Sequence, residues 1–303
     1  MDNGRFEWVS VLGLIAAMFI WGSSFVALKL ALQGYDPIVV VFLRLLVASL
    51  CFLPFAARYR KISFRRADIK YMLFMGFCEP GLYFLFETKA LQYTTASQAG
   101  MIATTLPLVV AVAASAFLGE RVSRRTLLGF LVAIAGACWL SLAAESSDGA
   151  PNPPLGNFLE FVAMVCATGY IVTLKHLAFR YPPFLLTGIQ AGIGCLFYFP
   201  LLFLPSTELP AAHPLVPMLA VLYLGTMVSL GAYGMYNFGL SRVPASQASA
   251  YINLIPVFAI LLDWWVLGQT LTPTQYAASL IVLAGVTLSQ DRGRHVASAM
   301  NPG

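Results

Sequence analysis

The sequence contains little charge: 10% of its 303 residues are charged, where a soluble domain carries about 25%. In place of charge it is 59% hydrophobic, and its mean hydropathy is +0.79. This composition excludes a soluble globular domain and predicts an integral membrane protein. The formal net charge of +5 is therefore no indication of nucleic-acid binding.

The sequence also lacks the motifs of the common catalytic and metal sites. Its five cysteines lie in apolar runs without Cys-x-x-Cys spacing, and its three histidines are scattered. It has no Gly-x-x-x-x-Gly-Lys-Ser/Thr, His-Glu-x-x-His or Gly-x-Ser-x-Gly pattern. We therefore expect no enzyme, no metal or other cofactor, and no direct use of ATP.

What the sequence does contain is a series of apolar runs of about 20 residues, the length that crosses a bilayer. They predict an all-α membrane protein of ten transmembrane helices, near 9–33, 37–57, 69–91, 96–118, 124–143, 156–179, 183–204, 215–240, 245–267 and 273–290. The polar, proline-rich stretch from Glu145 to Pro154 divides them into two fives. We expect a first repeat over 1–144, a linker over 145–154, a second repeat over 155–291 and a tail over 292–303.

A duplication supports this division. Ala96-Ser97-Gln98-Ala99 recurs as Ala245-Ser246-Gln247-Ala248, at an offset of 245 − 96 = 149. The same offset relates Pro107, Gly119 and Gly136 to Pro256, Gly268 and Gly285. A fixed offset over this length indicates a repeat. Because each repeat has an odd number of helices, we expect the second to be inverted in the membrane, as in many secondary transporters whose site lies at the midplane.

The distribution of Lys and Arg predicts the orientation. The predicted inside segments carry many of these residues, including Arg58, Arg60, Lys61, Arg65 and Arg66, whereas the predicted outside segments carry none. By the positive-inside rule both termini face the cytoplasm. We expect a bacterial inner-membrane location.

Two prolines interrupt equivalent helices close to the predicted midplane. Pro107 and Pro256 each remove a backbone donor and displace the carbonyl four residues earlier, which in lipid needs an internal partner or a water-filled cavity. A tolerated kink with local repair is one interpretation. The other is a cavity lined by nearby polar groups, and paired interruptions favour it. The residues concerned are Thr104, Tyr251 and Asn253.

Glu79, followed by Pro80, is an acidic residue at mid-depth in the predicted third helix. A charge there costs at least ~2.5–3.5 kcal/mol and is a functional candidate by default. It suits a proton-binding group or a counter-ion for a substrate amine, and the alternative is a structural carboxyl bonded to a neighbouring helix. Tyr83 and Glu87 share its face, but Glu87 lies nearer the outer end, where we expect it to be hydrated.

Arg44 in the second helix suits bidentate capture of a substrate carboxylate, or equally an ion pair with Glu79 or Glu87. Aromatic residues offer a lining for apolar groups: Trp21, Phe25, Tyr83, Tyr233, Tyr236 and Tyr251. Asn237 shares a helix face with Tyr233 and Tyr236. Asn157-x-x-Glu160 fits a capping box, which predicts a structural role at the start of the sixth helix.

These residues resemble a known family. The run from Ile20 to Lys29, Arg44 in its Phe-Leu-Arg-Leu-Leu context, the run from Ala90 to Ala99, and Pro107 together resemble the EamA-type branch of the drug/metabolite transporter superfamily. The resemblance covers about residues 9–290. It implies ten helices, a central cavity and alternating access, in a family that exports amino acids, their derivatives and other metabolites, with some importers.

The hypothesis from the sequence is thus a secondary transporter that exports small amphiphilic metabolites, with amino acids as the leading class. The alternatives are an importer of a small metabolite or a flippase-like lipid carrier, since sequence does not exclude a cavity that opens sideways to the bilayer. The expected partners are a small-molecule substrate and the lipid bilayer, with no nucleic acid, and a monomer is compatible with the sequence.

Overall fold

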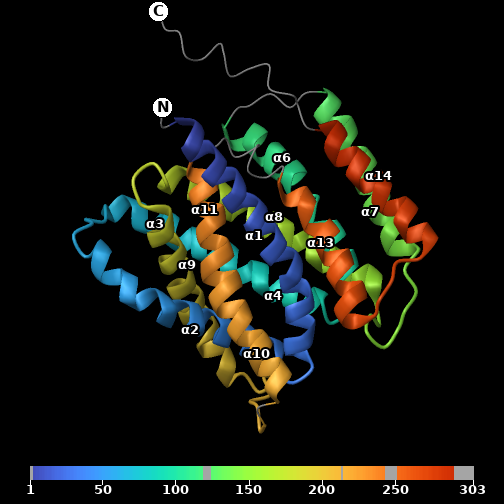
Figure 1. Ribbon diagram of the computed structural model, residues 1–303, viewed down its shortest axis with the longest axis horizontal. Coiled ribbons are helices and arrows are strands. Elements are labelled where there is room, and N and C mark those ends of the chain that lie inside the picture. Colours follow the sequence, from blue (N-terminus) through green and yellow to red (C-terminus); the bar gives the residue numbers. More distant parts are fainter. Residues whose placement is uncertain (1–2, 119–123, 213, 243–250, 290–303) are drawn as a thin grey trace, which may run out of the picture.

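The computed structural model describes residues 3–118, 124–212, 214–242 and 251–289, and over these ranges the regular structure is helical (Figure 1). The first half contains α1 (Asn3–Leu32), α2 (Pro37–Ala56), η1 (Ala57–Tyr59), α3 (Arg66–Gly76), η2 (Phe77–Leu82), α4 (Tyr83–Ala90), α5 (Ala96–Ala103), α6 (Leu106–Leu118) and α7 (Arg124–Leu142). The second half contains α8 (Pro153–Leu177), α9 (Pro183–Tyr198), η3 (Pro200–Phe203), α10 (Leu215–Tyr223), η4 (Leu224–Ala232), α11 (Tyr233–Arg242), η5 (Tyr251–Leu254), α13 (Ile255–Leu262), η6 (Asp263–Leu267) and α14 (Pro273–Ser289).

Six helices in the described ranges are long and apolar enough to cross a membrane: Val9–Leu32, Pro37–Tyr59, Ala96–Ala113, Pro153–Leu177, Pro183–Phe203 and Leu215–Arg242. Three shorter apolar helices accompany them, Leu127–Leu142, Tyr251–Leu267 and Pro273–Leu288. The predicted all-helical, multi-pass class is therefore confirmed. Gly119, the second copy of the repeated motif (residues 245–248) and the predicted tail (residues 292–303) lie outside the described residues.

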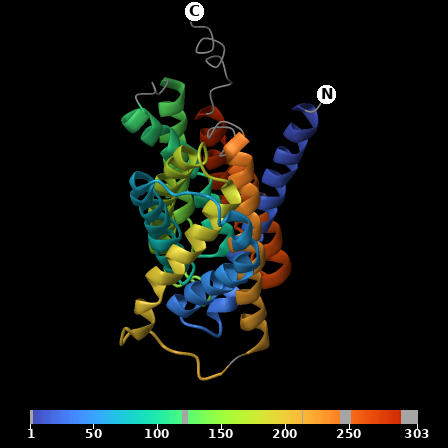
Figure 2. The same ribbon diagram turned by 90° about the vertical axis from the view of Figure 1, so that its left-hand side faces the viewer.

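The helices run between two ends of the bundle, and the 90° view of Figure 2 shows the same lengthwise arrangement. We call the end where α1 begins and α14 ends the upper end, as in Figure 1, and the end with the α1–α2 turn the lower end.

Local sequence explains where several helices begin. Proline stands at the first position of α2, α8 and α9, where its missing N–H is not needed. The side chain of Asp36 caps α2 by accepting from the N–H of Ile38 at 2.8 Å. Thr95 caps α5 in the same way, accepting from the N–H of Gln98 at 3.1 Å.

The predicted capping box at the sixth helix is wrong. The helix α8 begins at Pro153 with Asn152 as its N-cap, so Asn157 and Glu160 lie inside the helix and are buried. The amide of Asn157 instead contacts other helices, accepting from the Thr94 hydroxyl at 2.7 Å and donating to the Gln98 side chain at 2.9 Å. The capping rule failed here because a better cap, followed by two prolines, stands five residues earlier.

Each of the three prolines predicted at mid-depth lies at a break in a helix. Thr104 and Thr105 separate α5 from α6, whose second residue is Pro107. Pro256 is likewise the second residue of α13, after the short 3₁₀ segment η5. Pro80 lies in η2, directly after Glu79, whose backbone is extended (φ −149°, ψ 118°). These breaks put irregular backbone inside the bundle, where protein surrounds it.

The helices α7 and α14 pack side by side at one edge of the bundle (Figure 1). Glycines allow their close approach. A Cβ at Gly285 would lie 2.3 Å from the Ala133 backbone nitrogen, and a Cβ at Gly136 would lie 2.7 Å from the Val282 nitrogen. Gly136 and Gly285 are equivalent positions of the sequence repeat, so each repeat supplies the same contact to the other.

Polar ties join the helices at both ends. At the lower end the Lys29 ammonium donates to the Gly149 carbonyl at 2.5 Å, and the buried Asp263 carboxylate accepts from the Ser97 N–H at 2.9 Å and its hydroxyl at 2.5 Å. At the upper end the Asp68 carboxylate accepts from Arg180 at 2.8 Å and from the Tyr181 hydroxyl at 2.9 Å.

Asp68 lies just before the predicted third span. Its burial acts to raise its pKa, but the hydrogen bonds from Tyr181 and Arg180, with the charges of Arg180 and Arg65, outweigh burial and lower the pKa below its ordinary value. The upper tie is therefore ionised at neutral pH.

Candidate substrate-binding cavity

A pocket lies within the bundle, and its empty space, including the part open to the surroundings, is about 540 Å³. Its lining comes from both halves of the chain. The residues are Trp21, Ser24, Phe25, Arg44, Glu79, Tyr83, Phe84, Glu87, Ala103, Leu106, Met164, Ala167, Tyr170, Ile171, Val228, Tyr233, Tyr236, Ile252 and Ile255. A mostly apolar lining with few polar groups is typical of small-molecule sites.

The proline breaks contribute to this lining in a matched way. Ala103 and Leu106 flank the first break, and Ile252 and Ile255 flank the second. Both pairs are related by the repeat offset, since 252 − 103 and 255 − 106 each equal 149. The residues four positions and one position before each of Pro107 and Pro256 therefore line the pocket.

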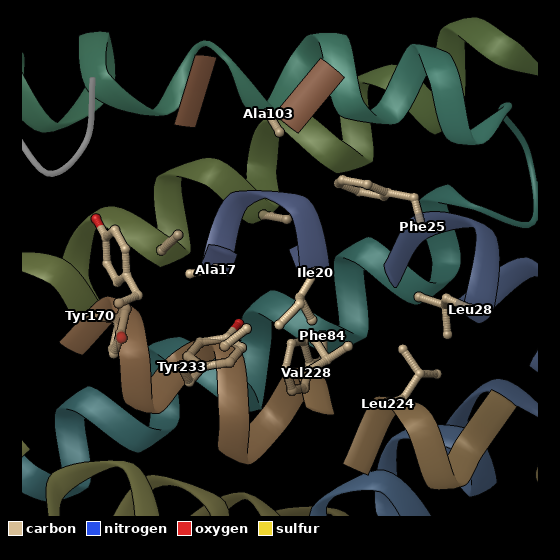
Figure 3. Close-up of a cluster of buried hydrophobic side chains, with 14 of the residues drawn as sticks. Ala17, Ile20, Phe25, Leu28, Phe84, Ala103, Tyr170, Leu224, Val228 and Tyr233 are labelled. Atoms are coloured by element: carbon tan, nitrogen blue, oxygen red, sulfur yellow. The ribbon is translucent and has the colours of Figure 1, made fainter. Parts of the chain in front are cut away.

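Aromatic rings make up much of the wall. The indole of Trp21 lies 5.1 Å from the Tyr233 ring and 4.7 Å from the Tyr236 ring, centroid to centroid. Phe84 and Tyr170 each approach Tyr233 edge-on at 6.2 Å. Figure 3 shows the side chains of Phe84, Tyr170 and Tyr233 gathered with Phe25 and Val228 from different helices. Packed rings with little rotational freedom form a firm apolar surface for a ligand.

Glu79 projects into the cavity from the break in η2. It is 4% exposed and accepts a hydrogen bond from the Tyr233 hydroxyl. Its extended backbone, rather than a helical one, directs the side chain away from the helix axis and toward α11. The carboxyl retains acceptor capacity beyond this one bond, so it can also bind a donor on a ligand.

Arg44 is held by three neighbours. Its Nε donates to the Ser229 hydroxyl at 3.0 Å, its Nη1 lies 3.8 Å from a Glu87 oxygen, and its guanidinium lies 3.9 Å from the centre of the Phe84 ring. Glu87 in turn accepts from the Tyr83 hydroxyl at 2.8 Å. The expectation that Glu87 is hydrated is wrong, because it is only 4% exposed and faces Arg44.

The lining therefore contains two carboxyls and one guanidinium. Arg44 and Glu87 largely compensate each other, which leaves Glu79 as the acidic group whose charge no described cation balances at contact distance. Such a site favours a ligand with an apolar body and a polar or cationic group placed at Glu79. Among the described residues no group of three His, Cys, Asp or Glu side chains could hold a metal ion.

The structure brings together seven of the residues that the sequence indicated, Trp21, Phe25, Arg44, Glu79, Tyr83, Tyr233 and Tyr236. Four others lie outside the lining. The Thr104 hydroxyl donates to the Met101 carbonyl of its own helix, and Asn237 is bonded to Tyr170 and Thr187 behind the wall. Tyr251 and Asn253 lie in η5, where Ile252 between them is the lining residue.

Sequence reasoning missed several wall residues, including Phe84, Met164 and Tyr170. Phe84 lies five residues after Glu79, a spacing that does not put two residues on one helix face, so helical spacing gave no signal for it. For Met164 and Tyr170 a signal was available, since each lies three residues from Ala167 on α8, a same-face spacing.

The apolar helices and the aromatic-lined pocket are those of a multi-pass membrane protein with a candidate ligand site. Comparison with known proteins gives the family. The model of the EamA-like transporter family matches residues 8–142 and 154–289, and this chain belongs to that family. The resemblance proposed from the sequence is confirmed.

Curated relatives are similar over most of the chain. An uncharacterized transporter, YetK of Bacillus subtilis, is 26% identical over 277 residues, covering 90% of this chain and 84% of its own. A probable terminal-alkyne amino-acid exporter of Streptantibioticus cattleyicolor is 24% identical over 284 residues, covering 93% and 94%. One solved crystal structure has a TM-score of 0.63 at 20% identity, covering 92% of this chain and 96% of that one, which supports the fold.

Proposed function

We propose that this protein is a secondary transporter that exports small amphiphilic metabolites, with amino acids and their derivatives as the first class to test. The observation that carries the proposal is the cavity, which places Glu79 and Arg44 among aromatic side chains inside the bundle. Glu79 receives the amine of the substrate or a proton, Arg44 is in place for its carboxylate, and the rings accept its apolar part. The amino-acid exporter among the relatives is consistent with this class.

In this proposal the chain forms two inverted five-helix repeats, over 1–144 and 155–291, that meet at the cavity. The matched lining positions and the reciprocal packing of Gly136 and Gly285 support it, since equivalent residues of the two repeats face one another. The breaks at Pro80, Pro107 and Pro256 then act as the points at which the helices bend as access alternates between the two sides. The protein lies in the bacterial inner membrane with both termini in the cytoplasm, which reporter fusions at each end would test.

The test is counterflow of radiolabelled amino acids in proteoliposomes at several pH values, with lipid scrambling measured in the same vesicles. We expect counterflow and no scrambling. Glu79→Gln is expected to abolish the pH dependence of transport while the protein still folds, because an amide of the same shape cannot take up a proton. Glu208→Gln, at an exposed glutamate far along the chain from the site, serves as the matched control.

Transport by Glu79→Gln that is unchanged at every pH would refute the role of Glu79. Scrambling without amino-acid counterflow would favour the lipid carrier instead. Net transport from the predicted outer side to the predicted cytoplasmic side would identify an importer, which uses the same cavity in the other direction.

A further inference from the structure

Glu160 is a buried acid that the proposed function does not use. It lies in α8, is 0% exposed, and faces α4, where it interacts electrostatically with Glu87 and with Tyr83. It does not line the cavity, whereas Glu87 and Tyr83 do. Glu160 lies four residues before the lining residue Met164, so it stands one turn beyond the lining on the same face of α8.

Both carboxyl oxygens of Glu160 lack a hydrogen-bond partner among the described residues. An ionised carboxylate buried without partners is strongly unfavourable, so the group takes a proton or a compensating cation. The neighbouring Glu87 makes ionisation of Glu160 more unfavourable, since two like charges repel strongly in a low dielectric.

The ionisable groups on the elements packed against α8 do not supply that cation. The described groups are Tyr83, Glu87 and Lys89 on α4, Cys78 and Glu79 on η2, Arg66, Asp68, Lys70 and Tyr71 on α3, Arg124, Arg125 and Cys138 on α7, and Tyr233, Tyr236 and Arg242 on α11. On α8 itself they are Cys166, Tyr170, Lys175 and His176, while α5 and α6 have none. In the described ranges none of these forms an ion pair with Glu160.

Of Glu87 and Glu160, Glu87 is the acid whose contacts favour the ionised form. It accepts from the Tyr83 hydroxyl at 2.8 Å and has the Arg44 guanidinium at 3.8 Å, two contacts that favour a carboxylate. Glu160 has neither kind of contact. The contacts of Glu87 therefore favour its ionised form, and the lack of contacts at Glu160 favours its protonated form.

We propose that Glu87 and Glu160 form a proton-binding pair inside the membrane, in which Glu160 holds the proton and Glu87 is ionised. The ligand is the proton itself, which converts the Glu160 carboxylate into a neutral carboxylic acid. Glu87 connects this site to the cavity, because it lines the wall on one side and faces Glu160 on the other. The proposal does not depend on transport or on the identity of a substrate.

The test is infrared spectroscopy of the purified full-length protein in lipid nanodiscs over a pH series. A neutral carboxylic acid has a C=O stretching band that an ionised carboxylate lacks. We expect the wild-type protein to show this band at neutral pH and Glu160→Gln to show a weaker one. The wild-type-minus-variant difference spectrum should therefore contain a positive C=O band from Glu160. Glu87→Gln is expected to keep the band with a shifted frequency, since Glu160 then loses its charged neighbour. Glu208→Gln is the exposed control and is expected to match the wild type.

A neutral-pH band of full intensity in Glu160→Gln overturns the proposal. Loss of the band in Glu87→Gln together with its retention in Glu160→Gln also overturns it, because the proton is then on Glu87. A spectrum of Glu79→Gln separates any contribution of that third acid. If Glu160→Gln does not fold, Glu160→Asp replaces it: a shifted band supports the assignment and an unshifted band contradicts it.

Discussion

The contact between α7 and α14 offers the sharpest test of the packing. In Gly285→Ala, the new Cβ starts 2.3 Å from the Ala133 nitrogen and 2.7 Å from the Gly129 oxygen. Ordinary contact begins at 3.4 Å, so the helices must separate locally by at least 3.4 − 2.3 = 1.1 Å. Both obstructing atoms are backbone, which cannot rotate away as a side chain does. Overpacking of this kind costs about 1–3 kcal/mol.

The assay is thermal unfolding of purified protein in one detergent, followed by the loss of the monodisperse species. Since 1 kcal/mol shifts the midpoint of a chain of 150–250 residues by about 2–4 °C, we expect Gly285→Ala to melt several degrees below the wild type. The matched control is Gly192→Ala in α9, where a Cβ would meet nothing within 4 Å. It is expected to melt at or slightly above the wild-type temperature, because alanine restricts the unfolded chain.

The reciprocal variant Gly136→Ala is expected to behave like Gly285→Ala, and the double variant to be less destabilised than the sum, because one separation of the helices relieves both clashes. A Gly285→Ala protein that melts with the wild type or with the Gly192→Ala control would refute the reasoning. The close approach of α7 and α14 would then not be a feature of the folded protein.

Three further outcomes are expected in the same unfolding assay. Arg44→Ala leaves Glu87 as an uncompensated buried charge and is expected to cost about 3–5 kcal/mol of stability. Much of this loss should be recovered in the double variant with Glu87→Gln. Equal melting temperatures of the single and double variants would contradict this. Ser97→Ala removes the hydroxyl bond to the Asp263 carboxylate and is expected to cost about 1.5–3 kcal/mol, and an unchanged melting temperature would argue against that tie. Because its folded-state pKa is lowered, Asp68 stabilises the protein at pH values above the ordinary Asp pKa of about 3.9 and loses this effect as the pH falls below it. Asp68→Asn is therefore expected to flatten this part of the curve of stability against pH. A curve of unchanged shape would contradict the role of Asp68.

The sequence was sufficient to predict the helical class and most helix positions, because these depend on apolar length and on local signals. The second predicted span, 37–57, corresponds to α2 (Pro37–Ala56), and a proline at the first helical position sets its start. The breaks at Pro107 and Pro256 were likewise predictable, because proline removes a backbone donor and disfavours a continuous helix, although Pro54 is accommodated inside α2.

The partners of the buried polar groups were not predictable in this way. Depth along a helix placed Glu87 near the predicted outer end, but hydration depends on which face the residue occupies and on what packs there. The decisive neighbour, Arg44, comes from another segment of the chain, whereas Tyr83 lies four residues before Glu87 on α4. Glu160 shows the same limit. The capping pattern considers only residues of its own helix, whereas the acid that interacts with Glu160, Glu87, lies on α4.

The position of Trp21 makes occupancy of the cavity measurable by intrinsic fluorescence. Its indole lies against the Tyr233 and Tyr236 rings, whereas Trp139, Trp264 and Trp265 are 42%, 60% and 77% exposed at the periphery. A molecule that enters the cavity changes the surroundings of one tryptophan and leaves those three as they were. The intrinsic fluorescence of the protein thus contains its own reporter of occupancy, which needs no dye, and Trp21→Phe gives the blank against which to read it.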